Sequence, residues 1–252
     1  MYAYGDHFFA TADRSAAESA TVIIGLLTEQ LPVASVLDLG CGRGMWLAQW
    51  RTHGAADVVG ADGPYVDIER LHIPRAAFIP CDLSTPVSLG RRFDLVQSLE
   101  VAEHLPESAA DQFVDNIVNH GDLILFSAAV PGQGGEQHIN EQPLDYWRNK
   151  FMARGYEAFD FLRPAIQNDR RVSFWYRQNI LLYVHTSRTA SLPAAVVASR
   201  IEPGALIADY LTPWMKFRVA AVRALPRAAV DEIARMKYKL LDLSDYFREP
   251  SK

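Results

Sequence analysis

The chain has 252 residues, of which 49% are hydrophobic and 22% charged, a composition typical of folded globular proteins that excludes a largely disordered chain. Its formal net charge of −5 argues against a broadly basic surface, so we expect no nucleic-acid partner. No apolar run reaches the roughly 18 residues of a membrane span, and residues 1–10 do not form a secretory signal, so the expected location is cytoplasmic.

A helix, a strand and a glycine-rich turn are the first predicted elements. Apolar residues at helical spacing over residues 15–31 predict the helix. The strand and the turn lie in residues 36–44, VLDLGCGRG, where three glycines follow an apolar run at alternate positions. Because glycine has no Cβ, the backbone there can turn sharply and a ligand can press against the main chain. A second helix, predicted to begin near Met45, would direct its free N–H groups at the same ligand.

Three more predicted strands each lead to an acidic residue. They cover residues 57–61, 77–80 and 93–99, and the acids that follow them are Asp62, Asp82 and Glu100. A carboxylate at the end of the second strand can accept hydrogen bonds from both hydroxyls of a ribose, and Asp82 is placed to meet an adenine amino group. Four strands separated by helical stretches indicate a doubly wound α/β sheet, whose ligand crevice lies at the carboxyl ends of its strands.

The middle of the chain completes the predicted sheet. Helical stretches are predicted over residues 101–105 and 109–119, and a buried fifth strand over residues 122–129. A closing pair of strands is predicted over residues 155–162 and 173–185.

The chain changes character at about Thr189, where alanine-rich segments with several prolines begin. Residues 217–225 and 229–243 predict amphipathic basic helices, which could pack on the rest of the chain, form a homodimer, or lie against a membrane surface or an anionic partner. Packing or self-association is the favoured hypothesis. We therefore predict two parts, a domain over residues 1–188 and a helical extension over residues 189–252.

The ordered motifs DLGCGRG, GAD, CDLS and FDLVQSLEVAEHLP resemble those of the class I S-adenosylmethionine-dependent methyltransferases over roughly residues 15–185. The resemblance implies a Rossmann-like, doubly wound and mostly parallel seven-stranded sheet with helices on both faces, and S-adenosyl-L-methionine as the cofactor. The alternative is a Rossmann-like domain for another nucleotide, but the chain has no G-x-G-x-x-G or Walker lysine pattern.

The same resemblance implies which residues hold the cofactor. The three glycines of the turn would approach the methionine part and the ribose, Asp62 would hold the ribose hydroxyls, and Asp82 with Leu83 would hold the adenine. Asp38 is expected to brace the glycine turn rather than to contact the ligand. The complete set implied as cofactor-binding is Asp38, Gly40, Cys41, Gly42, Gly44, Asp62, Gly63, Asp82, Leu83 and Glu100.

Candidate catalytic residues follow the fourth and fifth strands. Methyl transfer to a hydroxyl requires an acceptor aligned with the C–S bond and help in removing the hydroxyl proton. Glu100, Glu103 and His104 have the i, i+3, i+4 spacing that shares one face of a helical turn, and His138 lies in a polar loop, residues 132–142. We predict His104, His138 and Glu103 as the catalytic residues.

Three hypotheses are open for these side chains. In the first, Glu100 belongs to the cofactor loop, Glu103 is a solvated helix charge and His104 is a packed turn histidine. In the second, His104 or His138 is a metal-free general base. In the third, Glu100, Glu103, His104 and His138 surround a divalent cation such as Mg²⁺, which would bind and activate an acceptor hydroxyl.

The third hypothesis also rests on a resemblance. The E-x-x-E-H segment with a later histidine resembles the metal site of the small-RNA terminal 2′-O-methyltransferases. Its first three members are also similar to those of the ubiquinone-pathway O-methyltransferases. In those families the metal binds neighbouring hydroxyls of the acceptor.

The loop after the fifth strand carries a high density of polar residues, which suits a small hydroxyl-rich acceptor such as a sugar. The sequence resembles bacterial methyltransferases of glycans and specialised metabolites. We therefore expect an O-methyltransferase of a sugar- or polyol-like acceptor, assisted by a divalent metal. Two alternatives stay open: a metal-free N- or C-methyltransferase with a histidine base, and a non-catalytic cofactor-binding subunit of a partner protein.

Overall fold

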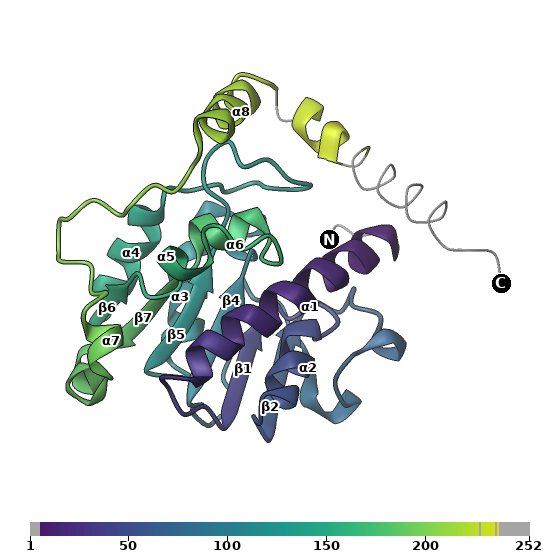
Figure 1. The fold of residues 1–252 in the computed structure, drawn as a ribbon. Helices are drawn as coiled ribbons and strands as arrows, with labels where there is room; N and C mark the ends of the chain where they lie inside the picture. Colours follow the sequence, from purple (N-terminus) through teal and green to yellow (C-terminus); the bar gives the residue numbers. More distant parts are fainter. Residues whose placement is uncertain (1–5, 227, 235, 237–252) are drawn as a thin grey trace.

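The computed structural model describes residues 6–226, 228–234 and 236 of the chain, and its centre is a seven-stranded sheet (Figure 1). The strands are β1 (Ser35–Leu39), β2 (Asp57–Asp62), β3 (Phe78–Pro80), β4 (Leu95–Leu99), β5 (Leu123–Ser127), β6 (Tyr156–Phe159) and β7 (Leu181–His185). Their order across the sheet is β3-β2-β1-β4-β5-β7-β6. Neighbouring strands are parallel except that β7 runs antiparallel to β5 and β6. The predicted doubly wound, mostly parallel sheet of seven strands is therefore confirmed.

The strand order reverses at β1, which pairs with β2 on one side and with β4 on the other. Such a reversal opens a crevice beyond the carboxyl ends of the central strands, where α/β proteins bind their ligands. Every residue of β4 and β5 is buried. This burial explains why apolar residues dominate these parallel strands, although Gln97 and Ser98 of β4 are buried as well.

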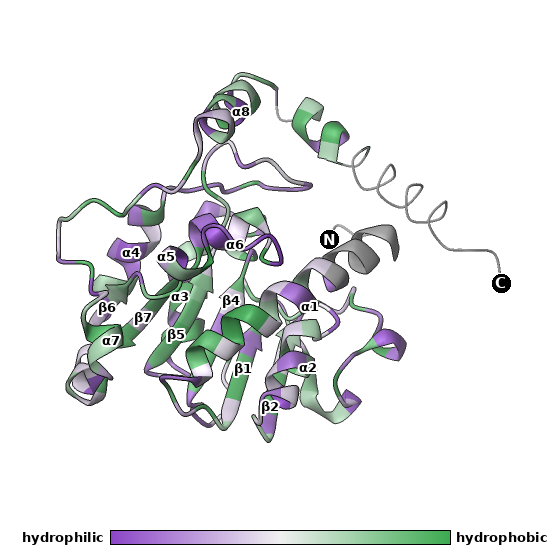
Figure 2. Cartoon of the chain, viewed as in Figure 1, coloured by the Kyte–Doolittle hydropathy of each residue, from purple (hydrophilic) through white to green (hydrophobic). Residues whose placement is uncertain are grey.

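Helices cover both faces of the sheet, as predicted. The α-helices are α1 (Asp6–Thr28), α2 (Met45–Thr52), α3 (Ala110–Val118), α4 (Leu144–Met152), α5 (Arg163–Ile166), α6 (Phe174–Asn179), α7 (Ala194–Val197) and α8 (Pro213–Arg223). Successive side chains of a strand point to opposite faces. Leu125 of β5 accordingly belongs to the apolar cluster of α1 and α2, and Phe126 to that of α3 and α4. Figure 2 shows hydrophobic residues concentrated along the strands between these layers.

The strand predicted over residues 173–185 is only partly correct. Its first half is the helix α6, and only Leu181–His185 forms strand β7. Tyr176 of α6 packs edge-on against Trp46 of α2, with ring centroids 5.2 Å apart. A tertiary contact of this kind overrides the preference of aromatic residues for strands, which is itself weak and context-dependent.

The helix predicted over residues 101–105 is also shorter than expected. The structure has a single 3₁₀ turn, Ala102–His104, and Leu105 is already extended. Pro106 explains this ending, because a proline disfavours helical backbone in the residue before it. The helices predicted over 15–31 and 109–119 correspond to α1 and α3, although α1 begins at Asp6.

The predicted C-terminal extension is only partly helical: residues 198–212, between α7 and α8, form turns and irregular backbone. Helix α8 contains most of the predicted segment 217–225, and residues 228–234 are helical, whereas the rest of the predicted segment 229–243, apart from residue 236, lies outside the described residues. Val196 of α7 is fully buried in the core, so the first part of the extension packs on the sheet domain. None of the helices within the described ranges is long and apolar enough to cross a membrane.

Candidate active site

A cavity of about 570 Å³ lies beyond the carboxyl ends of β1, β2 and β4. Its floor is the glycine turn after β1 and the segments that follow β2 and β4. Residues 133–139 of the loop after β5 form a second wall, and side chains of α8 and of the helical segment 228–234 form a third. The cavity therefore lies at the strand-order reversal, where the sequence predicted a ligand crevice.

Each glycine of the turn adopts a backbone conformation that side chains rarely permit. The φ angles of Gly40, Gly42 and Gly44 are 94°, 52° and 82°. A Cβ on Gly40 would lie 2.3 Å from Val101 Cγ2, so the Val101 side chain packs directly on the backbone of the turn. A Cβ on Gly42 would meet nothing within 4 Å. Because Gly42 lines the cavity, its open backbone faces the space that a ligand would fill.

Asp62 at the end of β2 joins the glycine turn to the cavity. Its carboxylate accepts hydrogen bonds from the N–H groups of Gly42 and Gly63, each at 2.6 Å, and from the hydroxyl of Tyr65, also at 2.6 Å. Burial raises the pKa of this carboxyl, and the Tyr65 and backbone hydrogen bonds oppose the rise. Tyr65 was not predicted as a site residue from the sequence, because no motif distinguishes it from a surface tyrosine.

Asp38 lies behind the turn and does not line the cavity. Its carboxylate accepts a hydrogen bond from Gln97 Nε2 at 2.8 Å, and Gln97 Oε1 accepts one from the indole of Trp50 at 2.7 Å. Burial raises the pKa of Asp38 to about 7 even though the Gln97 hydrogen bond lowers it. These contacts tie β1, β4 and α2 together beneath the turn.

Asp82 and Leu83 lie at the mouth of the cavity, after β3. Ser84 donates both its N–H and its hydroxyl to Asp82 Oδ1, at 2.9 and 2.6 Å. These hydrogen bonds lower the pKa of Asp82, so its carboxylate is ionised and accessible. Cys41 and Leu83 are buried and supply apolar surface to the same space.

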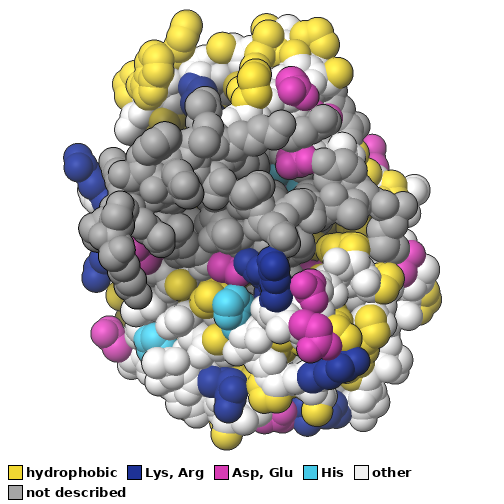
Figure 3. All heavy atoms as spheres, turned by 90° about the vertical axis from the view of Figure 1, so that its right-hand side faces the viewer, with side chains coloured by type: hydrophobic (Ala, Val, Ile, Leu, Met, Phe, Trp, Pro, Cys, Tyr) yellow, Lys and Arg dark blue, Asp and Glu magenta, His cyan; other side chains and the backbone are white. Residues whose placement is uncertain are grey.

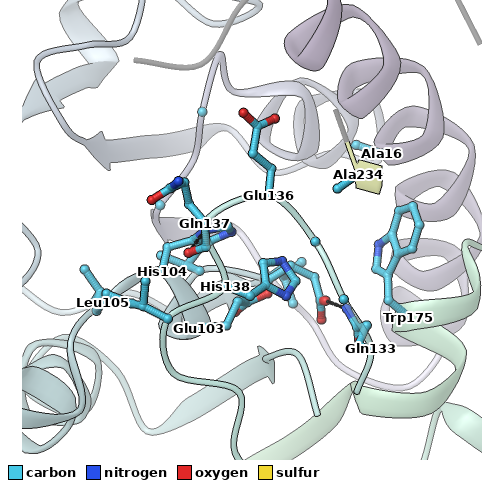
Figure 4. A pocket seen from close by; sticks show the side chains of 18 of the residues that line it. Ala16, Glu103, His104, Leu105, Gln133, Glu136, Gln137, His138, Trp175 and Ala234 are labelled. Atoms are coloured by element: carbon cyan, nitrogen blue, oxygen red, sulfur yellow. Dashed lines mark hydrogen bonds between the residues drawn. The ribbon is translucent and has the colours of Figure 1, made fainter. Parts of the chain in front are cut away.

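Glu103, His104 and His138 meet in the cavity wall (Figure 4). One ligand atom from each of the three lies within 4.8 Å of the others, and the two imidazole rings are 4.9 Å apart, edge to face. The Glu103 side chain is 0% exposed, so the hypothesis of a solvated helix charge is wrong. Neither carboxylate oxygen of Glu103 has a hydrogen-bond partner among the described residues.

The backbone around Glu103 is tied to the loop that carries His138. The N–H groups of Ile139 and Asn140 both donate to the carbonyl of Glu103, at 2.8 and 2.9 Å. His138 Nδ1 lies 3.0 Å from Glu141 Oε1. An ionised carboxylate only accepts hydrogen bonds, so Nδ1 is the donor of this pair, and in the neutral ring the lone pair is then on Nε2.

Glu141 also organises the loop itself, a role the sequence analysis did not predict. Its two carboxylate oxygens accept the N–H groups of Gly132 and Gly134, at 2.7 and 2.8 Å. The only sequence feature that pointed to Glu141 was its position in the polar loop, residues 132–142.

Glu100 stands apart from the other three predicted metal ligands. Its φ is 57°, outside the 3₁₀ turn, so the prediction that it shares a helical face with Glu103 and His104 is wrong. Its carboxylate instead accepts hydrogen bonds from Gln133 Nε2 at 2.6 Å and Asn179 Nδ2 at 3.2 Å. This network links the segment after β4 to α6.

Residues 13–147 match a protein-family model described as a methyltransferase domain. The chain belongs to the class I S-adenosylmethionine-dependent methyltransferases. It is 28% identical over 141 residues to malonyl-[acyl-carrier protein] O-methyltransferase of Pseudescherichia vulneris, an alignment that covers 54% of this chain and 55% of the relative. The chain thus spans about half the length of the curated relative that it matches.

Solved structures share the fold of this methyltransferase at low sequence identity. DesVI of Streptomyces venezuelae superposes with a TM-score of 0.54 at 15% identity, covering 72% of this chain and 96% of that one. The methyltransferase domain of bacterial CtHen1-C gives a TM-score of 0.50 at 18% identity, covering 68% and 97%. Magnesium protoporphyrin IX methyltransferase of Synechocystis PCC 6803 gives 0.50 at 20%, covering 73% and 91%.

Burial shifts the pKa values of two clustered side chains of this methyltransferase, Glu103 and His104, in opposite directions. It raises the pKa of Glu103 well above the usual range, and the nearby Glu100 adds to the rise. It lowers the pKa of His104 to about 3, with His138 contributing. The imidazole of His104 is therefore neutral near pH 7, which is the form that can bind a metal ion.

Proposed function

We propose that this methyltransferase methylates a hydroxyl of a small polar acceptor, sugar- or polyol-like, with the help of a divalent cation held by Glu103, His104 and His138. The observation that carries the proposal is the Glu103 carboxylate, which is fully buried beside two imidazoles with no hydrogen-bond partner among the described residues. Keeping this carboxylate ionised and unpaired would cost several kcal/mol, which is why burial raises its pKa. A cation at this position would remove that cost.

The donor atoms suit a divalent ion. A carboxylate with two imidazole nitrogens is a mixed oxygen and nitrogen set, which manganese, iron or zinc accepts more readily than magnesium does. When bound, such an ion lowers the pKa of a coordinated hydroxyl and orients it. Glu141 fixes the tautomer of His138 through Nδ1, as carboxylates do for metal-binding histidines.

The glycine turn and its acids fit the cofactor. Gly42 presents open backbone to the cavity and Asp62 lies beside it with an ionisable carboxylate, so we assign the ribose to Asp62 and the adenine to Asp82 and Leu83. Glu100 would contribute through its network with Gln133 and Asn179 rather than as a metal ligand. When bound, S-adenosyl-L-methionine supplies the electrophilic methyl group; the residues of this chain bind it, align the acceptor and exclude water.

A metal-free histidine base is less well supported. A general base works best when its pKa is close to the operating pH, and burial holds the pKa of His104 near 3. This weakens the alternative of an N- or C-methyltransferase that relies on His104. The acceptor is assigned to a hydroxyl because the facing loop is polar, with Gln133, Gln137 and His138 lining the cavity, and because the curated relative is an O-methyltransferase.

The test compares Glu103→Gln with Glu107→Gln, an isosteric change at an exposed acid near the same turn. Titration with Mn²⁺ followed by calorimetry should show binding to the wild type and to Glu107→Gln but not to Glu103→Gln. Transfer of labelled methyl to a panel of sugars and polyols should stop with a chelator and return with added Mn²⁺ or Mg²⁺. Full activity of Glu103→Gln in excess chelator would reject the metal site. Methylated amines with no methylated hydroxyls would reject the acceptor class.

A further inference from the structure

Two described arginines line the cavity, and they differ in what neutralises their charge. Arg43, in the glycine turn, forms an ion pair with the carboxylate of Asp13 on α1. Arg218, on α8, forms no ion pair with any acid in the described part of the chain. One positive charge at the cavity wall is therefore balanced within the protein, and the other is not.

Arg218 is held at the wall by contacts on two sides. Its Nη2 donates a hydrogen bond to the carbonyl of Gln133 at 3.2 Å. Its guanidinium carbon lies 5.3 Å from the ring centroid of Phe174 on α6, a distance at which a cation is attracted to the face of an aromatic ring. A guanidinium has five N–H donors, and the bond to Gln133 uses one of them. Most of the donors of Arg218 thus remain available to a ligand.

The position of α8 places this arginine on the side of the cavity that we assign to the acceptor. A Cβ on Gly134 would lie 3.3 Å from Val222 Cγ1 of α8, so the helix packs closely against the loop that carries His138. The carbonyl that accepts from Arg218 belongs to Gln133 of the same loop. The residues assigned to the ribose and the adenine follow β2 and β3 instead. The unbalanced charge therefore faces the acceptor rather than the adenosine.

The surroundings of Arg218 on this wall are apolar. The other described residues of α8 and of the segment after it that line the cavity are Val222, Leu225, Val230, Ile233 and Ala234. In Figure 3 hydrophobic side chains gather along the upper edge of the molecule, at the end where α8 lies. Opposite charges attract more strongly beside apolar surface than in water, because the local dielectric constant is lower. An anion would therefore bind more tightly here than to an arginine in open solvent.

We propose that Arg218 binds a carboxylate or phosphate group of the methyl acceptor, so that the acceptor is an acidic sugar or polyol. The planar guanidinium presents paired N–H donors that match two oxygens of such a group. Anchored at this point, the anion would orient the acceptor within the cavity. The inference rests on the proposed function, because it concerns the acceptor of that reaction, but it does not require the metal.

The test measures binding of paired compounds to the full-length protein saturated with S-adenosylhomocysteine, in the presence of a chelator. Glucuronic acid and glucose 6-phosphate are each compared with glucose, and galacturonic acid is compared with galactose, by ligand-observed NMR titration. We expect the anionic compound of at least one pair to bind about tenfold or more tightly than the neutral one. A preference for the carboxylates identifies sugar acids as the acceptors, and a preference for the phosphate identifies sugar phosphates.

Variants of two arginines on α8 separate binding from a structural role. Arg218→Gln should abolish the preference, and Arg218→Lys should keep only part of it, because an ammonium group keeps the charge but not the paired donors. Arg223→Gln is the matched control. Arg223 also donates to the loop, through the carbonyl of Pro131 at 2.9 Å, but it is not among the described residues that line the cavity. Loosening of α8 would weaken binding of anionic and neutral compounds alike, so the ratio of the two affinities reports the anion contact.

Several outcomes overturn the proposal. Equal affinities within every pair, or no binding by any of the anionic compounds, would do so. A preference that Arg218→Gln retains, or one that Arg223→Gln also loses, would do so as well. A tenfold loss of affinity for S-adenosylhomocysteine in Arg218→Gln would place this arginine at the carboxylate of the cofactor instead. Failure of the proposed function would appear as turnover without a metal or as methylated amines, and neither result alters the binding ratio.

Discussion

The hydroxyl of Tyr65 donates a hydrogen bond to Asp62 Oδ1, with 2.6 Å between the two oxygens. Asp62 is the carboxylate to which we assign the ribose hydroxyls, so Tyr65 occupies an acceptor position that the cofactor would use. The ring of Tyr65 also packs on Gly63, where a Cβ would lie 2.2 Å from Tyr65 Cε1. Cofactor binding must therefore displace or share this hydrogen bond.

Removing that hydroxyl should strengthen cofactor binding. Tyr65→Phe leaves the ring in place and removes one of the two donors to Asp62 Oδ1, the other being the Gly63 N–H. We therefore expect affinity for S-adenosylhomocysteine to rise about fivefold, the value of one neutral hydrogen bond. Calorimetric titration measures the change, with Tyr146→Phe on α4 as the control. Weaker binding by Tyr65→Phe would show instead that the hydroxyl contacts the ligand.

Asp62→Asn should weaken cofactor binding about tenfold or more. An amide carries no charge, and its NH₂ group would face the N–H groups of Gly42 and Gly63, which now donate to the carboxylate. Asp57→Asn, at the half-buried start of the same strand, is the control. Equal affinities of the two variants in calorimetry would remove Asp62 from the cofactor site.

Glu141→Gln should loosen the loop that carries His138. Three donors converge on the two carboxylate oxygens of Glu141, and a glutamine has only one oxygen with which to accept them. We expect Mn²⁺ affinity to fall about tenfold and amide hydrogen exchange in residues 132–142 to accelerate in metal-free protein. Unchanged exchange in this loop would contradict the role assigned to Glu141.

Asp38→Asn should change the pH dependence of stability. The folded state holds the pKa of Asp38 at about 7 against an ordinary value of 3.8, so between these values the folded chain binds more protons than the unfolded one. The stability of the wild type therefore falls as pH rises through this window, by up to about 4 kcal/mol for this group.

The asparagine variant lacks this titration. The free energy of unfolding of Asp38→Asn minus that of the wild type should rise between about pH 4 and pH 7 and then level off. Denaturant unfolding at a series of pH values measures the difference. A difference that stays constant with pH would mean that Asp38 is ionised throughout.

Much of the fold could be predicted because its signals are local. The apolar run before Gly40 and the acids after the next three strands follow from strand burial and strand ends, which adjacent residues determine. The error over residues 173–185 came from a long-range contact, because Tyr176 packs on Trp46, which lies 130 positions away along the chain. The residues next to Tyr176 in the sequence do not indicate such a contact.

The sequence by itself determined the sheet, the glycine turn and the family of this protein, because backbone sterics and strand burial depend on residues close together in the chain. Only the tertiary structure decided that Glu103 and His104 meet His138 while Glu100 turns away to Gln133 and Asn179. It also decided that α8 closes one wall of the cavity. These relationships arise because the loop after β5 and the C-terminal helices fold back over the strand ends. Residues that are far apart in the sequence come into contact there, and the pattern of neighbouring residues does not predict such contacts.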